Sequence, residues 1–196
     1  FDVSGILSDR NGLGSVLAKQ KKMKEAMETL KRALAIAGQG AGVRNEVLLI
    51  MTDAYRTEGK LTDLIAILEG EKPGDFQRLA ALAALYEETG QVEKALATYR
   101  KALAVDGKNI DARVKVVHLL QTAGELEQAI KEYEALIKAA PNNPDYVFEL
   151  CETLIQRGER AKALKLVMQL ESRVAGDEDL LVTVADFYER VEEKEK

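Results

Sequence analysis

Four eight-residue segments of the chain align with one another without gaps: EGKLTDLI from Glu58, TGQVEKAL from Thr89, AGELEQAI from Ala123 and RGERAKAL from Arg157. Their glycines follow one another at steps of 31, 34 and 34 residues, and an earlier copy, QKKMKEAM from Gln20, has Lys21 at the glycine position. The flanking residues match in order as well as the glycines do. The chain therefore contains an internal repeat of about 34 residues, which predicts a fold of stacked copies of one unit.

Each of these glycines lies between two amphipathic helical patterns. In residues 76–109, one apolar stripe at spacings of three and four precedes Gly90 and a second follows it. The two stripes are formed by Leu79, Leu82, Ala83 and Tyr86, and by Val92, Ala95, Leu96, Tyr99, Ala102 and Leu103. A glycine just past a helix end adopts positive φ without steric cost, so the chain reverses there. Asn109 and Asn143 suit helix caps and Pro144 a first helical position, so each unit is expected to be a helix hairpin.

The order of large and small residues in these units resembles that of the tetratricopeptide repeat family. The motif of that family has large residues at positions 4, 7 and 11, small ones at 8, 20 and 27, and an aromatic residue at 24. Residues 76–109 match with Leu79, Leu82, Ala83, Tyr86, Ala95, Tyr99 and Ala102. The resemblance implies an all-α fold, a right-handed superhelical solenoid of antiparallel helix hairpins. We expect a remnant of a preceding segment at 1–6 and a single array over 7–196, with repeats 7–40, 76–109, 110–143 and 144–177, an irregular repeat 45–75 and a terminal helix 178–194.

The irregular repeat departs from the motif in three ways. Leu64 occupies a position where alanine is expected, the second helix is short and breaks between Gly70 and Gly74, and about four extra residues precede the repeat within 38–44. We interpret the glycine-rich stretch 38–42 as a flexible linker, because it lacks the Lys-Ser/Thr pair that would hold a phosphate. The chain begins at Phe1 and stops in mid-pattern at Lys196, as expected for a piece of a longer protein.

Composition excludes several classes of function. The net charge is −5 and basic residues are interspersed with acidic ones, which argues against nucleic-acid binding. Cys151 is the single cysteine and His118 the single histidine, so we expect no disulfide, no metal, no cofactor and no catalytic site. Cys151 falls at a small-residue position and is interpreted as a buried packing thiol. No apolar run reaches the length of a membrane span, and a soluble cytoplasmic protein is favoured over a periplasmic one.

The resemblance implies a scaffold that binds a partner protein or peptide in a concave groove lined by the first helix of each hairpin. Chaperone-binding members grip a carboxylate with lysine, arginine and asparagine at set groove positions, and this chain lacks that set. Groove positions 2, 5, 6, 9, 12 and 13 contain eleven acidic and four basic side chains. This balance favours a basic and apolar partner segment, although first-turn acids also occur simply because they favour helix N-termini.

We expect Phe148 to be an exposed anchor for the partner, because position 5 does not require a large aromatic residue for packing. The candidate partner-binding residues are Leu49, Asp53, Glu87, Asp111, Val114, Lys115, His118, Asp145, Phe148, Glu149, Glu152, Ile155 and Asp186. Two other functions stay open: self-assembly through the ends of the array, and a spacer or regulatory array within a larger multidomain protein.

Overall fold

The structure, a computed structural model, describes residue 25 and residues 28–32, 41–70 and 75–193. All regular structure in these residues is helical, without strands. Contacts divide the chain into two compact units, unit 1 (Phe1–Gly107) and unit 2 (Lys108–Lys196). Each unit is described by itself.

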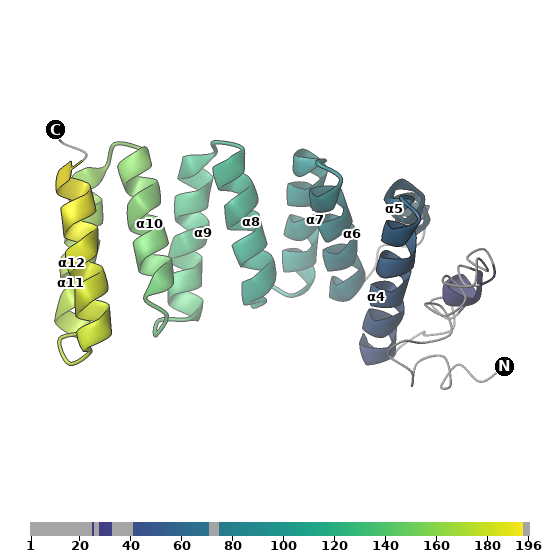
Figure 1. The fold of residues 1–196 in the computed structure, drawn as a ribbon, viewed down its shortest axis with the longest axis horizontal. Helices are drawn as coiled ribbons and strands as arrows, with labels where there is room; N and C mark the ends of the chain where they lie inside the picture. Colours follow the sequence, from purple (N-terminus) through teal and green to yellow (C-terminus); the bar gives the residue numbers. More distant parts are fainter. Residues whose placement is uncertain (1–24, 26–27, 33–40, 71–74, 194–196) are drawn as a thin grey trace. The chain divides into compact units, whose positions relative to one another are not determined.

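Consecutive helices form antiparallel hairpins in both units (Figure 1). Unit 1 contains the hairpins α4 (Ala41–Thr57) with α5 (Leu61–Gly70) and α6 (Phe76–Glu88) with α7 (Val92–Val105). Unit 2 contains α8 (Ile110–Thr122) with α9 (Leu126–Ala139), α10 (Asp145–Gln156) with α11 (Arg160–Arg173), and α12 (Glu178–Glu193). Within each unit the next hairpin packs on the previous one, α5 against α6, α9 against α10 and α11 against α12. This nearest-neighbour order is that of a repeat protein.

The four repeat glycines close the hairpins in the same way. Gly59, Gly90, Gly124 and Gly158 all have positive φ, between 67° and 85°. At Gly124, its N–H donates to the carbonyl of Gln121 at 3.0 Å and the N–H of Glu125 donates to the carbonyl of Leu120 at 2.8 Å. The same pair of bonds recurs at the other three glycines. This is the Schellman arrangement, which satisfies the last carbonyls of the first helix and turns the chain back.

The entry to each first helix repeats as well. The side chains of Asp75, Asn109 and Asp177 accept hydrogen bonds from the backbone N–H three residues later, at 2.9–3.1 Å. Asn143 accepts one from the N–H of Asp145 at 3.0 Å. The predicted cap at Asn109 is confirmed. At α10 the N-cap is Pro144, so the prediction that Asn143 is the cap is wrong by one residue, although the Asn143 side chain accepts the first helical N–H. Asp75 and Asp177 extend the series at the same step of 34 residues.

Small residues lie where the two helices of a hairpin approach most closely. Ala83, Ala95 and Ala129 are fully buried, as is Cys151. The Cys151 thiol donates to the carbonyl of Ala163 on α11 at 3.4 Å, and burial raises its pKa to about 12. The interpretation of Cys151 as a buried packing thiol is confirmed.

The irregular repeat is a hairpin of unequal helices. Helix α4 has 17 residues and α5 has 10, whereas α6 and α7 have 13 and 14. The four residues 41–44 form the first turn of α4, so the prediction of a linker over 38–42 is wrong for residues 41 and 42. Leu64 is fully buried in the alanine position of this hairpin, and the shorter α5 was correctly predicted.

The predicted all-α fold of stacked helix hairpins is confirmed in the described residues. Repeats 76–109, 110–143 and 144–177 each coincide with one hairpin. The remnant 1–6 and most of the first repeat 7–40 lie outside the described residues. A single continuous array over 7–196 stays a prediction, because the two units are not placed relative to each other.

Candidate partner-binding surfaces

The first helices of unit 2 are linked side by side through their side chains. The amide of Gln121 on α8 donates to the Thr153 hydroxyl on α10 at 3.1 Å. The guanidinium of Arg190 on α12 donates to the carboxylate of Glu152 on α10 at 2.9 Å. Helices α8, α10 and α12 therefore present their outer side chains on one surface, which we call the first-helix face of unit 2.

Most of the predicted site residues in unit 2 belong to this face. Exposed ones are Asp111, Lys115, His118, Asp145, Glu149 and Asp186, and half-buried ones are Val114, Glu152 and Ile155. In unit 1, Leu49 and Asp53 are exposed on α4 and Glu87 is half-buried on α6. The side chain of Leu49 is 71% exposed, among the most exposed of the large apolar side chains in the described residues. Ten of the thirteen predicted residues thus lie on α8, α10 and α12, nine of them exposed or half-buried, and the other three lie in unit 1.

Phe148 is the exception, because it does not lie open on the surface. Only 9% of Phe148 is exposed, and its ring packs against that of Phe187 on α12. Both residues belong to the hydrophobic core of unit 2. The expectation that Phe148 is exposed is therefore wrong: the next first helix covers position 5 of α10.

Several acidic groups of the first helices already have partners. The carboxylate of Glu88 on α6 receives two hydrogen bonds from Arg56 on α4, at 2.6 and 2.8 Å. These bonds hold the pKa of Glu88 below its usual value. In unit 2, Glu149 accepts a hydrogen bond from the Tyr133 hydroxyl at 3.2 Å, and Glu152 is paired with Arg190. The count of eleven acids therefore overstates the free negative charge of the predicted groove.

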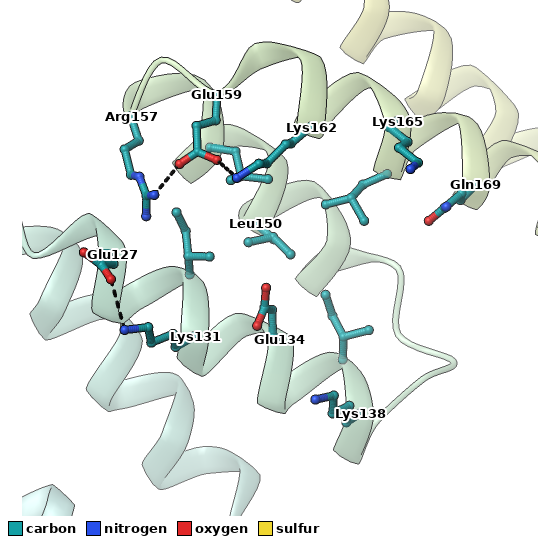
Figure 2. A pocket seen from close by; sticks show the side chains of 14 residues that line it. Glu127, Lys131, Glu134, Lys138, Leu150, Arg157, Glu159, Lys162, Lys165 and Gln169 are labelled. Atoms are coloured by element: carbon teal, nitrogen blue, oxygen red, sulfur yellow. Dashed lines mark hydrogen bonds and ion pairs between the residues drawn. The ribbon is translucent and has the colours of Figure 1, made fainter.

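Unit 2 has a concave surface between the second helices α9 and α11 (Figure 2). It has a volume of about 690 Å³ and we call it the second-helix groove. Its lining residues are Glu127, Ile130, Lys131, Glu134, Ile137, Lys138, Leu150, Leu154, Arg157, Glu159, Lys162, Lys165, Leu166 and Gln169. Sequence reasoning missed this groove, because it placed all ligand contacts on first helices. The available signal was the run of lysines at 131, 138, 162 and 165.

Reactive groups are not gathered anywhere in the described residues. His118 is exposed on α8 and Cys151 is buried under α11. Among the described residues, no group of three or more His, Cys, Asp or Glu side chains is arranged to hold a metal ion. None of the described helices is long and apolar enough to cross a lipid bilayer.

Helix hairpins closed by a positive-φ glycine, with buried alanines at the close approach, define the class of helical repeat proteins. Family models described as tetratricopeptide repeat match residues 87–147, 120–181 and 10–39. The chain belongs to the tetratricopeptide repeat family. Members of this family bind protein or peptide partners and are generally non-catalytic scaffolds. In general terms, the chain is therefore a protein-interaction scaffold. No curated protein matches the chain at a significant level.

Solved structures with the same fold are distant in sequence. A crystal structure of MamA protein is 19% identical, with 89% of this chain and 97% of that chain covered and a TM-score of 0.60. YrrB, titled a TPR protein with an unusual peptide-binding site, is 15% identical with 88% of each chain covered and a TM-score of 0.57. TPR-like repeats of a putative kinesin light chain from Podosopora anserina are 18% identical, with coverages of 90% and 99% and a TM-score of 0.57. These likenesses show the fold.

Proposed function

We propose that this chain binds a basic, partly apolar segment of a partner protein along the first-helix face of unit 2. The observation that carries the proposal is the excess of unpaired carboxylates on this face. Groove positions 2, 5, 6, 9, 12 and 13 of α8, α10 and α12 contain seven acidic and two basic side chains. One of the basic side chains, Arg190, is already paired with Glu152. A basic segment would meet net negative charge along three adjacent helices.

Helix capping accounts for only part of this charge. Asp111 and Asp145 lie in the first turns of α8 and α10, where an acid is favoured by about 0.3–1 kcal/mol through the helix dipole. Asp186 and Glu189 lie past the middle of α12, far from its N-terminus, and both are exposed. Neither carboxylate has a hydrogen-bond or ion-pair partner among the described residues. These two are therefore the acids that folding of the helix does not explain.

Apolar side chains on the same face suit the apolar part of the partner. Val182 on α12 is 60% exposed, and Val114 and Ile155 are half-buried on α8 and α10. Phe148 supports this surface from below by packing under α12 rather than by touching a partner. YrrB shares the fold and is titled as having a peptide-binding site, which supports a peptide ligand.

The test uses the whole chain and a synthetic helical peptide of about 15 residues, with leucines at helical spacing and lysines at the other positions. Fluorescence anisotropy should show binding that weakens as salt is raised, since exposed charges are screened. The variant Asp186→Asn with Glu189→Gln should weaken binding roughly 2- to 30-fold, because each of the two exposed pairs contributes about 0.2–1 kcal/mol.

The matched control is Asp63→Asn with Glu93→Gln, which removes two exposed carboxylates from α5 and α7. Equal affinities in the two variants would contradict the proposal. Light scattering over a concentration series distinguishes the alternative of self-assembly, which predicts a mass that grows with concentration.

A further inference from the structure

We propose that the second-helix groove of unit 2 is a second binding site, which takes an acidic amphipathic helix of a partner protein. This site lies between the second helices α9 and α11, shares only α10 with the first-helix face, and has the opposite charge. Five basic and three acidic side chains line it. The inference does not depend on the function proposed for the first-helix face.

The floor of the groove is apolar and comes from three helices. Leu150 and Leu154 of α10 lie at the bottom and are almost fully buried. Ile137 of α9 and Leu166 of α11 are only half-buried, on opposite walls. A ligand that lies between α9 and α11 would therefore cover two apolar side chains that the fold leaves partly open to water.

The basic side chains on the rim have acidic partners at one end of the groove but not at the other (Figure 2). Lys131 pairs with Glu127 at 3.0 Å. Glu159 pairs with Lys162 and, at 2.5 Å, with Arg157. The hydrogen bond with Lys162, and to a smaller extent the charge of Arg157, lowers the pKa of Glu159. At this end of the groove, the single carboxylate of Glu159 is therefore the partner of two cations.

At the other end, Lys138 of α9 and Lys165 of α11 lie on opposite sides of the groove in Figure 2. Neither ammonium has a hydrogen-bond or ion-pair partner among the described residues. Glu134 lies between the two ends and offsets only one of the positive charges. The carboxylates of an acidic ligand would supply the missing partners on both walls.

The lysines are not required by the repeat itself. One repeat earlier, the positions of Lys131 and Lys138 are occupied by Ala97 and Ala104 on α7. Lys138 lies in the last turn of α9, where a cation is favoured by the helix dipole. Lys165 lies in the middle of α11, so no such effect explains it. The basic rim is thus a property of this groove rather than of the tetratricopeptide hairpin.

The experiment measures fluorescence anisotropy of a labelled helical peptide of about 15 residues, with leucines at helical spacing and glutamates elsewhere, added to the whole chain. The same peptide with lysines in place of the glutamates is the charge control. We expect the acidic peptide to bind, and the double variant Lys138→Glu, Lys165→Glu to weaken its binding at least fivefold. The variant Lys138→Met, Lys165→Met keeps the side-chain length and should weaken binding by a smaller factor.

The matched control variant is Lys60→Glu with Lys101→Glu, which makes the same change in net charge on exposed lysines of unit 1. It should bind the acidic peptide as the wild type does. Equal loss in the groove and control variants, or no binding of the acidic peptide to the wild type, would overturn the proposal. A concentration-dependent mass that the groove variant abolishes would also overturn it, since the occupant would then be a second copy of this chain. Binding of the basic peptide reports on the first-helix face, so failure of one proposal is distinguishable from failure of the other.

Discussion

The rings of Phe148 on α10 and Phe187 on α12 lie against each other, with centroids 6.0 Å apart and planes inclined by 45°. Arg190 of α12 in turn lies over the Phe187 ring, with its guanidinium carbon 5.7 Å from the centroid, and reaches across to Glu152. An aromatic pair of this geometry contributes about 0.5–1.5 kcal/mol beyond the area that it buries. This contact therefore holds α12 against α10.

Truncating either ring should loosen the end of unit 2. Phe148→Ala is expected to destabilise the protein by about 3–5 kcal/mol, because it removes a buried aromatic side chain and leaves a cavity. Urea unfolding followed by circular dichroism measures the loss. Val182→Ala on the exposed side of α12 is the control and should be within about 0.5 kcal/mol of the wild type. An equally small effect for Phe148→Ala would show that α12 does not depend on this contact.

Overpacking of a hairpin should be costly at its closest approach. Ala129 on α9 is fully buried, so Ala129→Leu is expected to cost about 1–3 kcal/mol by forcing α8 and α9 apart. Ala97 on α7 is exposed, and Ala97→Leu should be near neutral. Thermal unfolding of both variants gives the comparison. If Ala129→Leu unfolds at the same temperature as the wild type, α8 and α9 can move apart at this position without a loss of stability, and the prediction is wrong.

A hairpin turn should depend on glycine for its backbone conformation rather than for space. Gly124 has φ of +74°, and a Cβ at this position would meet no atom within 4 Å. Gly124→Val should therefore cost more than about 1 kcal/mol through backbone strain alone. Gly124→Asn should cost less, because asparagine tolerates the left-handed region. Similar chemical-denaturation midpoints for the two variants would contradict this account.

Alkaline pH should unfold the protein through its tyrosines. The pKa of Tyr86 is raised to about 12 by burial and by its hydrogen bond to Glu69. Burial and Glu149 raise the pKa of Tyr133 still further. A raised pKa in the folded state means that these groups stabilise the fold fully below pH 10, and that this stability is lost as the pH rises through 10 and above.

The measurement is the free energy of unfolding as a function of pH, with Tyr133→Phe as the variant. Replacing Tyr133 removes one ionisable hydroxyl, so the decline of stability above pH 10 should become shallower. The hydrogen bonds of Tyr133 to Gln121 and Glu149 are lost at every pH, which shifts the whole curve but not its slope. An unchanged slope would show that Tyr133 does not contribute to alkaline unfolding.

The sequence predicts the hairpins well because their determinants are local. The turn at Gly124 needs only a residue that adopts positive φ, and the buried Ala129 needs only to be small. Each of these residues recurs at the same position in several repeats, so a departure in one repeat, such as Leu64, does not hide the pattern. Asp75 and Asp177 could also have been recognised as caps, since they extend the series of Asn109 and Asn143 by one step in each direction.

The surfaces are harder to predict because they depend on side chains from different repeats. Helical periodicity assigns Phe148 to the outward side of α10, but its burial depends on Phe187 in the following repeat. The second-helix groove likewise requires the lysines of two repeats to meet over Leu150 and Leu154 of a third helix. Position within one unit predicts neither outcome, because each depends on how neighbouring hairpins pack.

The glycine turns also bear on how such a chain lengthens during evolution. Every bond that closes the turn at Gly124 joins residues within five positions of each other, and the cap at Asn109 reaches only three residues ahead. A duplicated unit therefore contains its own helix cap and its own glycine turn. No distant residue has to change for the copy to form a hairpin. Insertion or loss of whole units of 34 residues should be tolerated, whereas a gain or loss of a few residues inside a helix would rotate its apolar stripe away from the neighbouring hairpin.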